Sequence, residues 1–424
     1  MEAAHDDLEK RWYVLALLTA TYAMSIADRF VISTLIEPIK ADLRLSDASV
    51  GFLSGVALAI FYVTAGLPLA QWADRTSRKT MIVASLTAWS AMTTICAVTY
   101  SFWELLLARV GVGIGEAGGT PPSQALVSDY FPREQRAFAL SLFSVGASLG
   151  SMLGSSAGYA SDAWGWRSAF FLLGIPGVAL AAVIGLTVNE PKRGRLDHWA
   201  PATLPATLLD TARYTVGTPA LRHCMLGGTI FTLWAWGLMW WTPSYLVRSH
   251  GMTLGAAGGA ISLMHGVGGT LVLLGTTAFM RPLARRDPRL VPWFIAAVIA
   301  IGTVPSIVAF TSTSRSVTLS MLWLFIPLSY ATFGPTFALV QNLAPPGMRA
   351  QAVALLLFFS NIANLVIAPQ VIGFASDYLL PHYGMESLRT ALIPLAFTGF
   401  WAAAHFWISG RYMIAGLAGV QRKG

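Results

Sequence analysis

The sequence predicts an all-α membrane protein, with twelve transmembrane helices in two pseudo-symmetric six-helix bundles. Its composition, the spacing of its apolar runs and an internal repeat lead to this prediction. Of the 424 residues, 55% are apolar and only 11% are charged. A soluble domain carries about a quarter charged residues, so lipid must cover much of this surface. The net charge of +8 does not indicate a nucleic-acid partner, because the basic residues lie between apolar runs and not on one solvated face.

Twelve apolar runs are long enough to cross a bilayer, which takes roughly 20 residues. They lie near residues 12–39, 48–73, 80–100, 103–129, 137–160, 167–188, 221–247, 254–280, 290–310, 316–343, 350–376 and 388–409. We therefore expect an N-terminal six-helix bundle (1–188), a cytoplasmic linker (189–220) and a C-terminal bundle with a short tail (221–424). The linker is a tether, unless an amphipathic piece near 204–214 lies on the membrane interface.

Lysine and arginine gather in the loops on one side of the predicted membrane. Most of the 28 such residues fall in the loops that share a side with the N-terminus. Such a bias places those loops in the cytoplasm. We expect a multi-pass protein of the bacterial inner (plasma) membrane, with both termini cytoplasmic.

The two halves of the chain repeat each other. The stretch that contains Arg136 leads to GYASD at residues 158–162, and the stretch that contains Arg349 leads to GFASD at residues 373–377. Two six-helix halves in parallel repeat are a transporter architecture, with the substrate site between them near the bilayer midplane.

Four charged residues lie well inside predicted spans, away from their ends: Asp28 and Arg29 in the first span, and Arg109 and Glu116 in the fourth. Arg109 and Glu116 are seven residues apart and share one helix face. Charges in a bilayer nearly always face a cavity or a partner, and two carboxylates balance two guanidiniums here. The cluster is either a purely structural ion-pair group or a functional site. We favour function, because apolar packing would serve stability alone equally well.

The loop after the second span carries Asp74, Arg75, Arg78 and Lys79. It resembles the loop signature of the major facilitator superfamily, in which a carboxylate is thought to cap a neighbouring helix and latch one conformation. Ala70 and Ser77 replace the glycines of that signature. The alternative interpretation is ordinary positive charge on a cytoplasmic loop.

A closer resemblance rests on Asp28–Arg29 in the first span and RVGVGIGEA in the fourth. This pair is similar to the spinster branch of the superfamily, whose members are linked to lysophospholipid and sphingosine-phosphate export. The resemblance implies a major facilitator fold and a secondary active transporter, monomeric by default. Gly146, Gly150 and Gly154 in the fifth span partly resemble the antiporter motif without its proline, and we expect them to pack helices.

The second half offers polar and aromatic residues but no ionised side chain in its predicted membrane interior. The candidates for a cavity wall are Trp234, Trp236, His265, Gln341, Asn361 and Asn364. A lone histidine in a helix is more often a hydrogen-bonded packing residue than a titrating one. Aromatic walls opposite charges would suit an amphipathic substrate.

These residues predict proton-linked alternating access. Burial favours the protonated form of a carboxylate, and a nearby guanidinium favours the charged form. Asp28 and Glu116 are therefore the expected proton-coupling residues. Their protonation would free Arg29 or Arg109 to bind an anionic headgroup, since the planar guanidinium suits phosphate. The resemblance to the spinster branch implies that the substrate is an amphipathic anionic or zwitterionic lipid, such as a lysophospholipid or a sphingosine-phosphate-like molecule.

Other functions stay open. A proton-coupled carrier of a soluble organic anion or drug would share the fold and the charges. A membrane-embedded lipid-modifying enzyme would need a His–Asp pair or a metal-ligand cluster, but the seven histidines are scattered and the two cysteines lie in apolar runs. We therefore expect no catalytic residue, metal or cofactor.

Overall fold

The computed structural model describes residues 10–56, 76–191 and 207–421. These ranges contain helices and no strands, which confirms the all-α prediction. Seven helical segments within them are long and apolar enough to cross a membrane. One of these, Pro346–Val420, has 75 residues, far more than a single crossing needs. The count of twelve spans stays a prediction.

The described chain divides into two compact units, residues 1–200 with 252–266, and residues 201–251 with 267–424. The division of the sequence at 188 and 220 stays a prediction. Unit 1 contains α2 (Arg11–Thr34), α3 (Ile36–Leu43), α4 (Asp47–Gly51), the π-helix η1 (Phe52–Val56), α6 (Arg78–Cys96), α7 (Phe102–Ala117), α8 (Thr120–Tyr130), α9 (Arg133–Trp164), α10 (Trp166–Thr187) and α13 (Leu254–Leu263).

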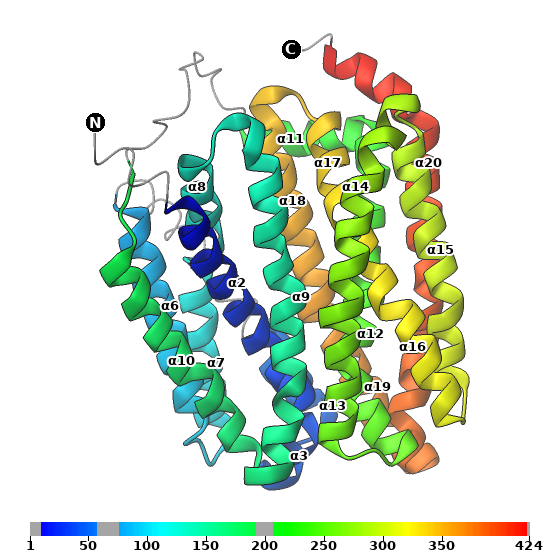
Figure 1. Ribbon diagram of the computed structural model, residues 1–424. Coiled ribbons are helices and arrows are strands. Elements are labelled where there is room, and N and C mark those ends of the chain that lie inside the picture. Colours follow the sequence, from blue (N-terminus) through cyan, green and yellow to red (C-terminus); the bar gives the residue numbers. More distant parts are fainter. Residues whose placement is uncertain (1–9, 57–75, 192–206, 422–424) are drawn as a thin grey trace. The chain divides into compact units, whose positions relative to one another are not determined.

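Helices α2 and α9 lie side by side in unit 1 (Figure 1) because three glycines of α9 let the two backbones meet. A Cβ at Gly146 would lie 2.7 Å from the carbonyl oxygen of Thr19. A Cβ at Gly154 would lie 2.6 Å from the carbonyl oxygen of Ala27. The glycines that resemble the antiporter motif therefore pack helices, as predicted, and they fix the backbone next to Asp28.

Helix α13 packs on the C-terminal half of α9. Asp162 Oδ2 accepts a hydrogen bond of 2.7 Å from the backbone N–H of Gly255, in the first turn of α13. An anion is favourable there because the helix dipole places positive charge at this end. Ser262 Oγ adds a 2.9 Å bond to the carbonyl oxygen of Met152. The repeated GYASD sequence thus holds a helix contact within unit 1.

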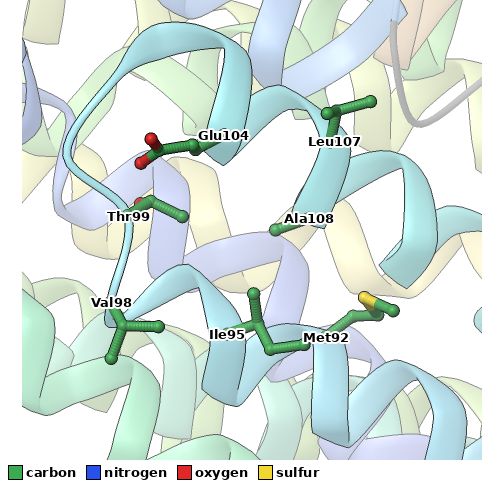
Figure 2. Close-up of a pocket in the computed structure, with 7 residues that line it drawn as sticks. All are labelled: Met92, Ile95, Val98, Thr99, Glu104, Leu107 and Ala108. Carbon is green, nitrogen blue, oxygen red and sulfur yellow. The ribbon is translucent and has the colours of Figure 1, made fainter.

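An apolar groove of about 400 Å³ runs between α6 and α7 (Figure 2). Its lining residues come from the end of α6, the loop that follows and the first half of α7: Met92, Ile95, Val98, Thr99, Glu104, Leu107 and Ala108. The carboxylate of Glu104 lies at the loop end, beside Thr99.

Unit 2 contains α11 (Leu208–Gly217), α12 (Pro219–His250), α14 (Thr270–Arg286), α15 (Leu290–Thr311), α16 (Arg315–Ser329), η3 (Tyr330–Thr332), α17 (Phe333–Leu343), η4 (Pro346–Met348), α18 (Arg349–Asn361), η5 (Ile362–Ile367), α19 (Ala368–Tyr383), η6 (Gly384–Glu386) and α20 (Ser387–Gln421). The amphipathic piece expected near 204–214 corresponds to α11, which begins at Leu208; residues 204–206 lie outside the described ranges.

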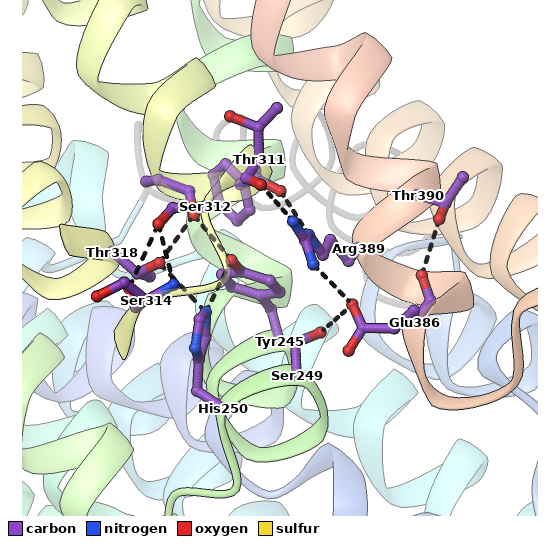
Figure 3. Close-up of polar contacts among 12 residues, drawn as sticks. Tyr245, Ser249, His250, Thr311, Ser312, Ser314, Thr318, Glu386, Arg389 and Thr390 are labelled. Carbon is purple, nitrogen blue, oxygen red and sulfur yellow. Dashed lines mark hydrogen bonds and ion pairs between the residues drawn. The ribbon is translucent and has the colours of Figure 1, made fainter. Parts of the chain in front are cut away.

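A polar network joins the ends of α12, α15, α16 and α20 within unit 2 (Figure 3). Tyr245 donates a 2.7 Å hydrogen bond to the carbonyl oxygen of Ala309, and His250 Nε2 lies 2.9 Å from the same hydroxyl. Arg389 Nε donates to the carbonyl oxygen of Phe310 at 3.1 Å, and its Nη1 lies 3.2 Å from a carboxylate oxygen of Glu386. These bonds satisfy carbonyl groups that the end of α15 leaves without helical partners.

Several predicted spans are interrupted. The fourth span, predicted over 103–129, breaks between α7 and α8 at Gly118 and Gly119. Two prolines occupy the first turn of α8, where their missing N–H groups cost no helical hydrogen bond. The first span breaks at Leu35, between α2 and α3, and the eighth passes from α13 through the π-helix η2 (Met264–Gly269) into α14.

Candidate functional site

The four predicted intramembrane charges lie together in unit 1. Arg29 Nε and Nη2 both donate to Glu116 Oε2, at 3.0 and 2.8 Å. The side chain of Glu116 is fully buried, and that of Arg29 is 20% exposed. This ion pair joins α2 to α7, so two segments 87 residues apart in the chain meet through the charges that the sequence singled out.

Arg109 lies on the same helix as Glu116, about two turns earlier, and is completely buried. Its Nη1 donates to the backbone carbonyl oxygen of Asp28 at 3.3 Å. Its Nε and Nη2, and Glu116 Oε1, have no hydrogen-bond partner in the part of the chain that the structure describes. Nε and Nη2 form one edge of the guanidinium, the edge that binds two oxygens of a phosphate or carboxylate.

Asp28 is buried too, at 2% exposure. Its Oδ1 accepts a 2.8 Å hydrogen bond from the hydroxyl of Thr93 on α6, a partner that sequence reasoning missed. A single threonine in an apolar helix carries no signal of its own, because its hydroxyl usually bonds the backbone one turn earlier.

Close packing of α7 on α6 fixes the site. A Cβ at Gly115 would lie 2.7 Å from the backbone nitrogen of Trp89, and one at Gly119 would lie 2.8 Å from its ring. Glu116 therefore sits between two contact points and has little freedom to move along α6. The glycine-rich sequence of the fourth span serves to bring a charged helix face against α6 and α2.

The predicted latch is described in part. Asp74 and Arg75 lie outside the described residues. Arg78 forms an ion pair with Asp129 of α8, and the backbone N–H of Lys79 lies 3.3 Å from Glu190 Oε2.

Glu190, from the segment predicted as linker, caps α6. Its Oε1 accepts a 2.7 Å hydrogen bond from the backbone N–H of Arg78, and its carboxylate also bonds the hydroxyl of Ser77. Helix N-termini leave N–H groups unpaired and favour negative charge. Within the described residues, the carboxylate that caps α6 is thus Glu190, which the sequence did not single out; the role of Asp74 stays a prediction.

The six residues predicted to line a cavity are divided between the two units. His265 is completely buried and lies edge-on to Phe30, with ring centroids 5.0 Å apart, so it belongs to unit 1 beside the charge cluster. Trp234 is 1% exposed, and its Nε1 donates to Ser306 at 3.2 Å, which makes it a packing residue of unit 2.

The other four candidates also lie in unit 2. Trp236 packs against the ring of Phe333, with centroids 5.7 Å apart. Gln341 is exposed on α17, Asn361 ends α18 and Asn364 lies in η5, both half-buried. A cavity role for these residues stays a prediction. No group of three or more His, Cys, Asp or Glu in the described residues could hold a metal ion.

The fold and the buried charges define a membrane transporter, and comparison with known proteins gives its family. The profile of the Major Facilitator Superfamily matches residues 18–369, so the chain belongs to this superfamily. It is a transporter and not an enzyme.

Its relatives include spinster proteins. The chain is 33% identical to an MFS-type efflux pump of Mycolicibacterium smegmatis, over 95% of this chain and 94% of the relative. It is 26% identical to the sphingosine-1-phosphate transporter SPNS2 of Danio rerio, over 88% and 77%. A solved bacterial homologue of the human lysosomal transporter spinster, in an inward-facing conformation, superimposes with a TM-score of 0.84 at 27% identity, over 96% and 98% of the two chains.

Proposed function

We propose that this protein is a proton-coupled secondary transporter of an anionic or zwitterionic amphiphile such as a lysophospholipid, which works by alternating access. The observation that carries the proposal is the buried Arg109, whose Nε and Nη2 have no partner in the described residues. A buried charged donor without a partner is costly, and intramembrane charges usually mark substrate or proton pathways.

The proton would bind Glu116. Oε2 of this carboxylate carries both hydrogen bonds from Arg29, while Oε1 has no partner in the described residues. Protonation removes the charge that holds Arg29 and leaves its guanidinium available to an anion. Asp28 is the second carboxylate, and its Oδ1 accepts a hydrogen bond from Thr93. Its protonation would remove a negative charge near Arg109, although Arg109 bonds the backbone carbonyl of Asp28 and not its carboxylate.

The headgroup would bind the edge of Arg109. Two parallel N–H donors match two oxygens of a phosphate, and the planar guanidinium is only weakly hydrated, so it suits a desolvated site. The amphiphile is suggested by the relatives, one of which is named as a sphingosine-1-phosphate transporter. The same charges would also serve a soluble organic anion. The relative named as an efflux pump keeps that second function open.

The rest of the proposal concerns the membrane location, the topology, the oligomeric state and the conformational latch of the protein. We place the protein in the bacterial inner membrane as a monomer, with both termini cytoplasmic. The supporting argument is the lysine and arginine bias of the loops. The conformational latch would use Arg78 and Lys79 with Asp74 and Arg75. Within it, the pair of Arg78 with Asp129 ties α6 to α8, the helix that continues the charged α7.

Binding of oleoyl lysophosphatidylglycerol to the purified protein tests the proposal. We expect saturable binding that is tighter at pH 5.5 than at pH 7.5. Arg109→Gln should weaken it by at least tenfold, because one bidentate charge-assisted contact is lost. Monoolein, which has the same chain without phosphate, should bind no tighter to the wild type than to this variant. Equal binding of both ligands by both proteins would contradict a headgroup site at Arg109.

A further inference from the structure

The groove between α6 and α7 is a second feature of unit 1 that can bind a ligand, and it is separate from the charge cluster. It is open along one side, since Ile95 is 43% exposed, Val98 52% and Leu107 69%. Helices α6 and α7 belong to the predicted third and fourth spans, in which exposed apolar residues would face lipid. The occupant of such a groove therefore comes from the bilayer.

The loop end of the groove lies at headgroup depth. Tyr100 and Trp103, on either side of the α7 start, are 74% and 70% exposed, and exposed aromatic rings of this kind gather at the membrane–water interface. Glu104 is the next residue along α7. The groove then runs down α7 to Leu107 and Ala108, which are one turn deeper.

The far end of the groove is closed by Met92. Its side chain packs so closely on Gly111 that a Cβ there would lie 2.7 Å from the methionine sulfur. From Glu104 to Gly111 the helix rises about 10 Å, at 1.5 Å per residue. That length and the volume of about 400 Å³ fit the upper part of one acyl chain.

Glu104 supplies the only charge in the lining (Figure 2). Its Oε2 accepts a 2.8 Å hydrogen bond from the backbone N–H of Tyr100, and in the described residues no basic side chain pairs with it. Nearby, Arg167 Nη2 donates to the carbonyl oxygen of Thr99 at 2.7 Å, so a guanidinium lies against the same loop, where its Nη1 also pairs with Asp42 at 2.7 Å. A negative group at the groove mouth with a positive group beside its loop complements a zwitterion.

We infer that this groove binds a bilayer phospholipid with a primary-amine headgroup, of the phosphatidylethanolamine type. The ammonium donates to Glu104, the phosphate lies on the Arg167 side, and one acyl chain fills the groove. A choline headgroup has no N–H to donate, and a glycerol headgroup leaves the lipid anionic next to a carboxylate. The site goes beyond transport and does not depend on proton coupling at Glu116.

Native mass spectrometry of the purified protein tests the site, with phosphatidylethanolamine, phosphatidylcholine and phosphatidylglycerol of identical chains. We expect the ethanolamine lipid to be retained about two- to fivefold more than either other lipid, the preference that an exposed ion pair gives. Glu104→Gln should remove this preference. The amide oxygen still accepts a hydrogen bond, so the α7 cap survives while the charge is lost.

A second pair of variants tests the groove itself. Leu107→Trp should fill it and lower retention of the ethanolamine lipid, whereas Ile114→Trp, on an exposed position of the same helix outside the lining, should not. Three results would overturn the inference: equal retention of the three lipids, a preference that Glu104→Gln leaves unchanged, or Glu104-dependent binding of dodecylamine without any preference among the phospholipids.

Discussion

The ion pair between Arg29 and Glu116 predicts a large coupling energy. Glu116→Gln removes one charge and leaves Arg29 next to an amide. A hydrogen bond to a charged group contributes about 1.5–3 kcal/mol, and a neutral one about 0.5–1.5 kcal/mol. In this variant the acceptor of both Arg29 hydrogen bonds, of 2.8 and 3.0 Å, changes from a charged carboxylate to a neutral amide. The expected loss is therefore about 2–3 kcal/mol of unfolding free energy.

The variant of the partner residue, Arg29→Gln, gives a second estimate of the unfolding free energy that this ion pair contributes. Breaking a fully buried ion pair costs about 3–5 kcal/mol, but the Arg29 side chain is 20% exposed, so water compensates part of the loss. Arg29→Gln leaves Glu116 charged and completely buried, and we expect it to be the more destabilising single change. The double variant holds two amides, which can hydrogen-bond each other, and should recover about 2 kcal/mol relative to additivity.

Equilibrium unfolding in mixed detergent micelles measures all four proteins of this double-mutant cycle. An interaction energy near 2 kcal/mol supports a direct, largely desolvated pair. Residues that do not interact add within about 0.3–0.5 kcal/mol. A value in that range would refute the reasoning, because it would mean that the two side chains do not depend on each other in the folded protein.

Three further predictions concern the frame of the site. Gly154→Ala places a Cβ 2.6 Å from a carbonyl oxygen of α2 and should lower the free energy of unfolding by about 1–3 kcal/mol. The control Gly275→Ala meets nothing within 4 Å and should raise the free energy of unfolding slightly. Thermal unfolding of both variants checks this, and equal effects would contradict the close contact. Glu190→Gln should lower the free energy of unfolding by up to about 1 kcal/mol at low salt, because it removes a negative charge from the start of α6. In 1 M salt the difference from the wild type should shrink. An effect that does not depend on salt would argue against an interaction with the helix dipole. A hydrogen bond from Arg167 holds the pKa of Asp42 below its ordinary value. The stability that this hydrogen bond contributes is therefore present at any pH above the ordinary pKa of Asp, and it is lost only as the pH falls through the lower pKa of Asp42 in the folded protein. Asp42→Asn should therefore leave the pH dependence of transport between pH 5 and 8 unchanged, and an altered profile in a flux assay would show that this outer pair takes part in coupling.

The charge cluster could be predicted from the sequence because the membrane leaves few choices. Asp28, Arg29, Arg109 and Glu116 must find partners in a medium without water, and their helical spacing restricts which faces can meet. The details could not be predicted. Both hydrogen bonds of Arg29 go to Glu116, while Arg109 contacts a backbone carbonyl of Asp28, a choice that depends on side-chain length and on how closely the glycines bring the helices.

The helix ends were harder to predict than the helices. Glu190 lies in the predicted linker and Asp129 at the end of the predicted fourth span, yet one caps α6 and the other binds Arg78. Such partners are far apart in the sequence, and only the packing brings them together. The break at Gly118 and Gly119 had a local signal, since two prolines follow directly. The apolar run continues through it, so its length alone does not reveal where the helix breaks.

Proton movement coupled to substrate flux tests the central claim most directly. The protein is reconstituted into liposomes that enclose a pH-sensitive dye, and oleoyl lysophosphatidylglycerol is added under an imposed pH gradient and without one. We predict lipid flux that follows the gradient, together with a dye signal that requires the lipid. Glu116→Gln should abolish that signal while the folded protein still binds the lipid. Lipid-dependent proton movement that persists in Glu116→Gln, or gradient-independent flux in the wild type, would contradict proton coupling at this site.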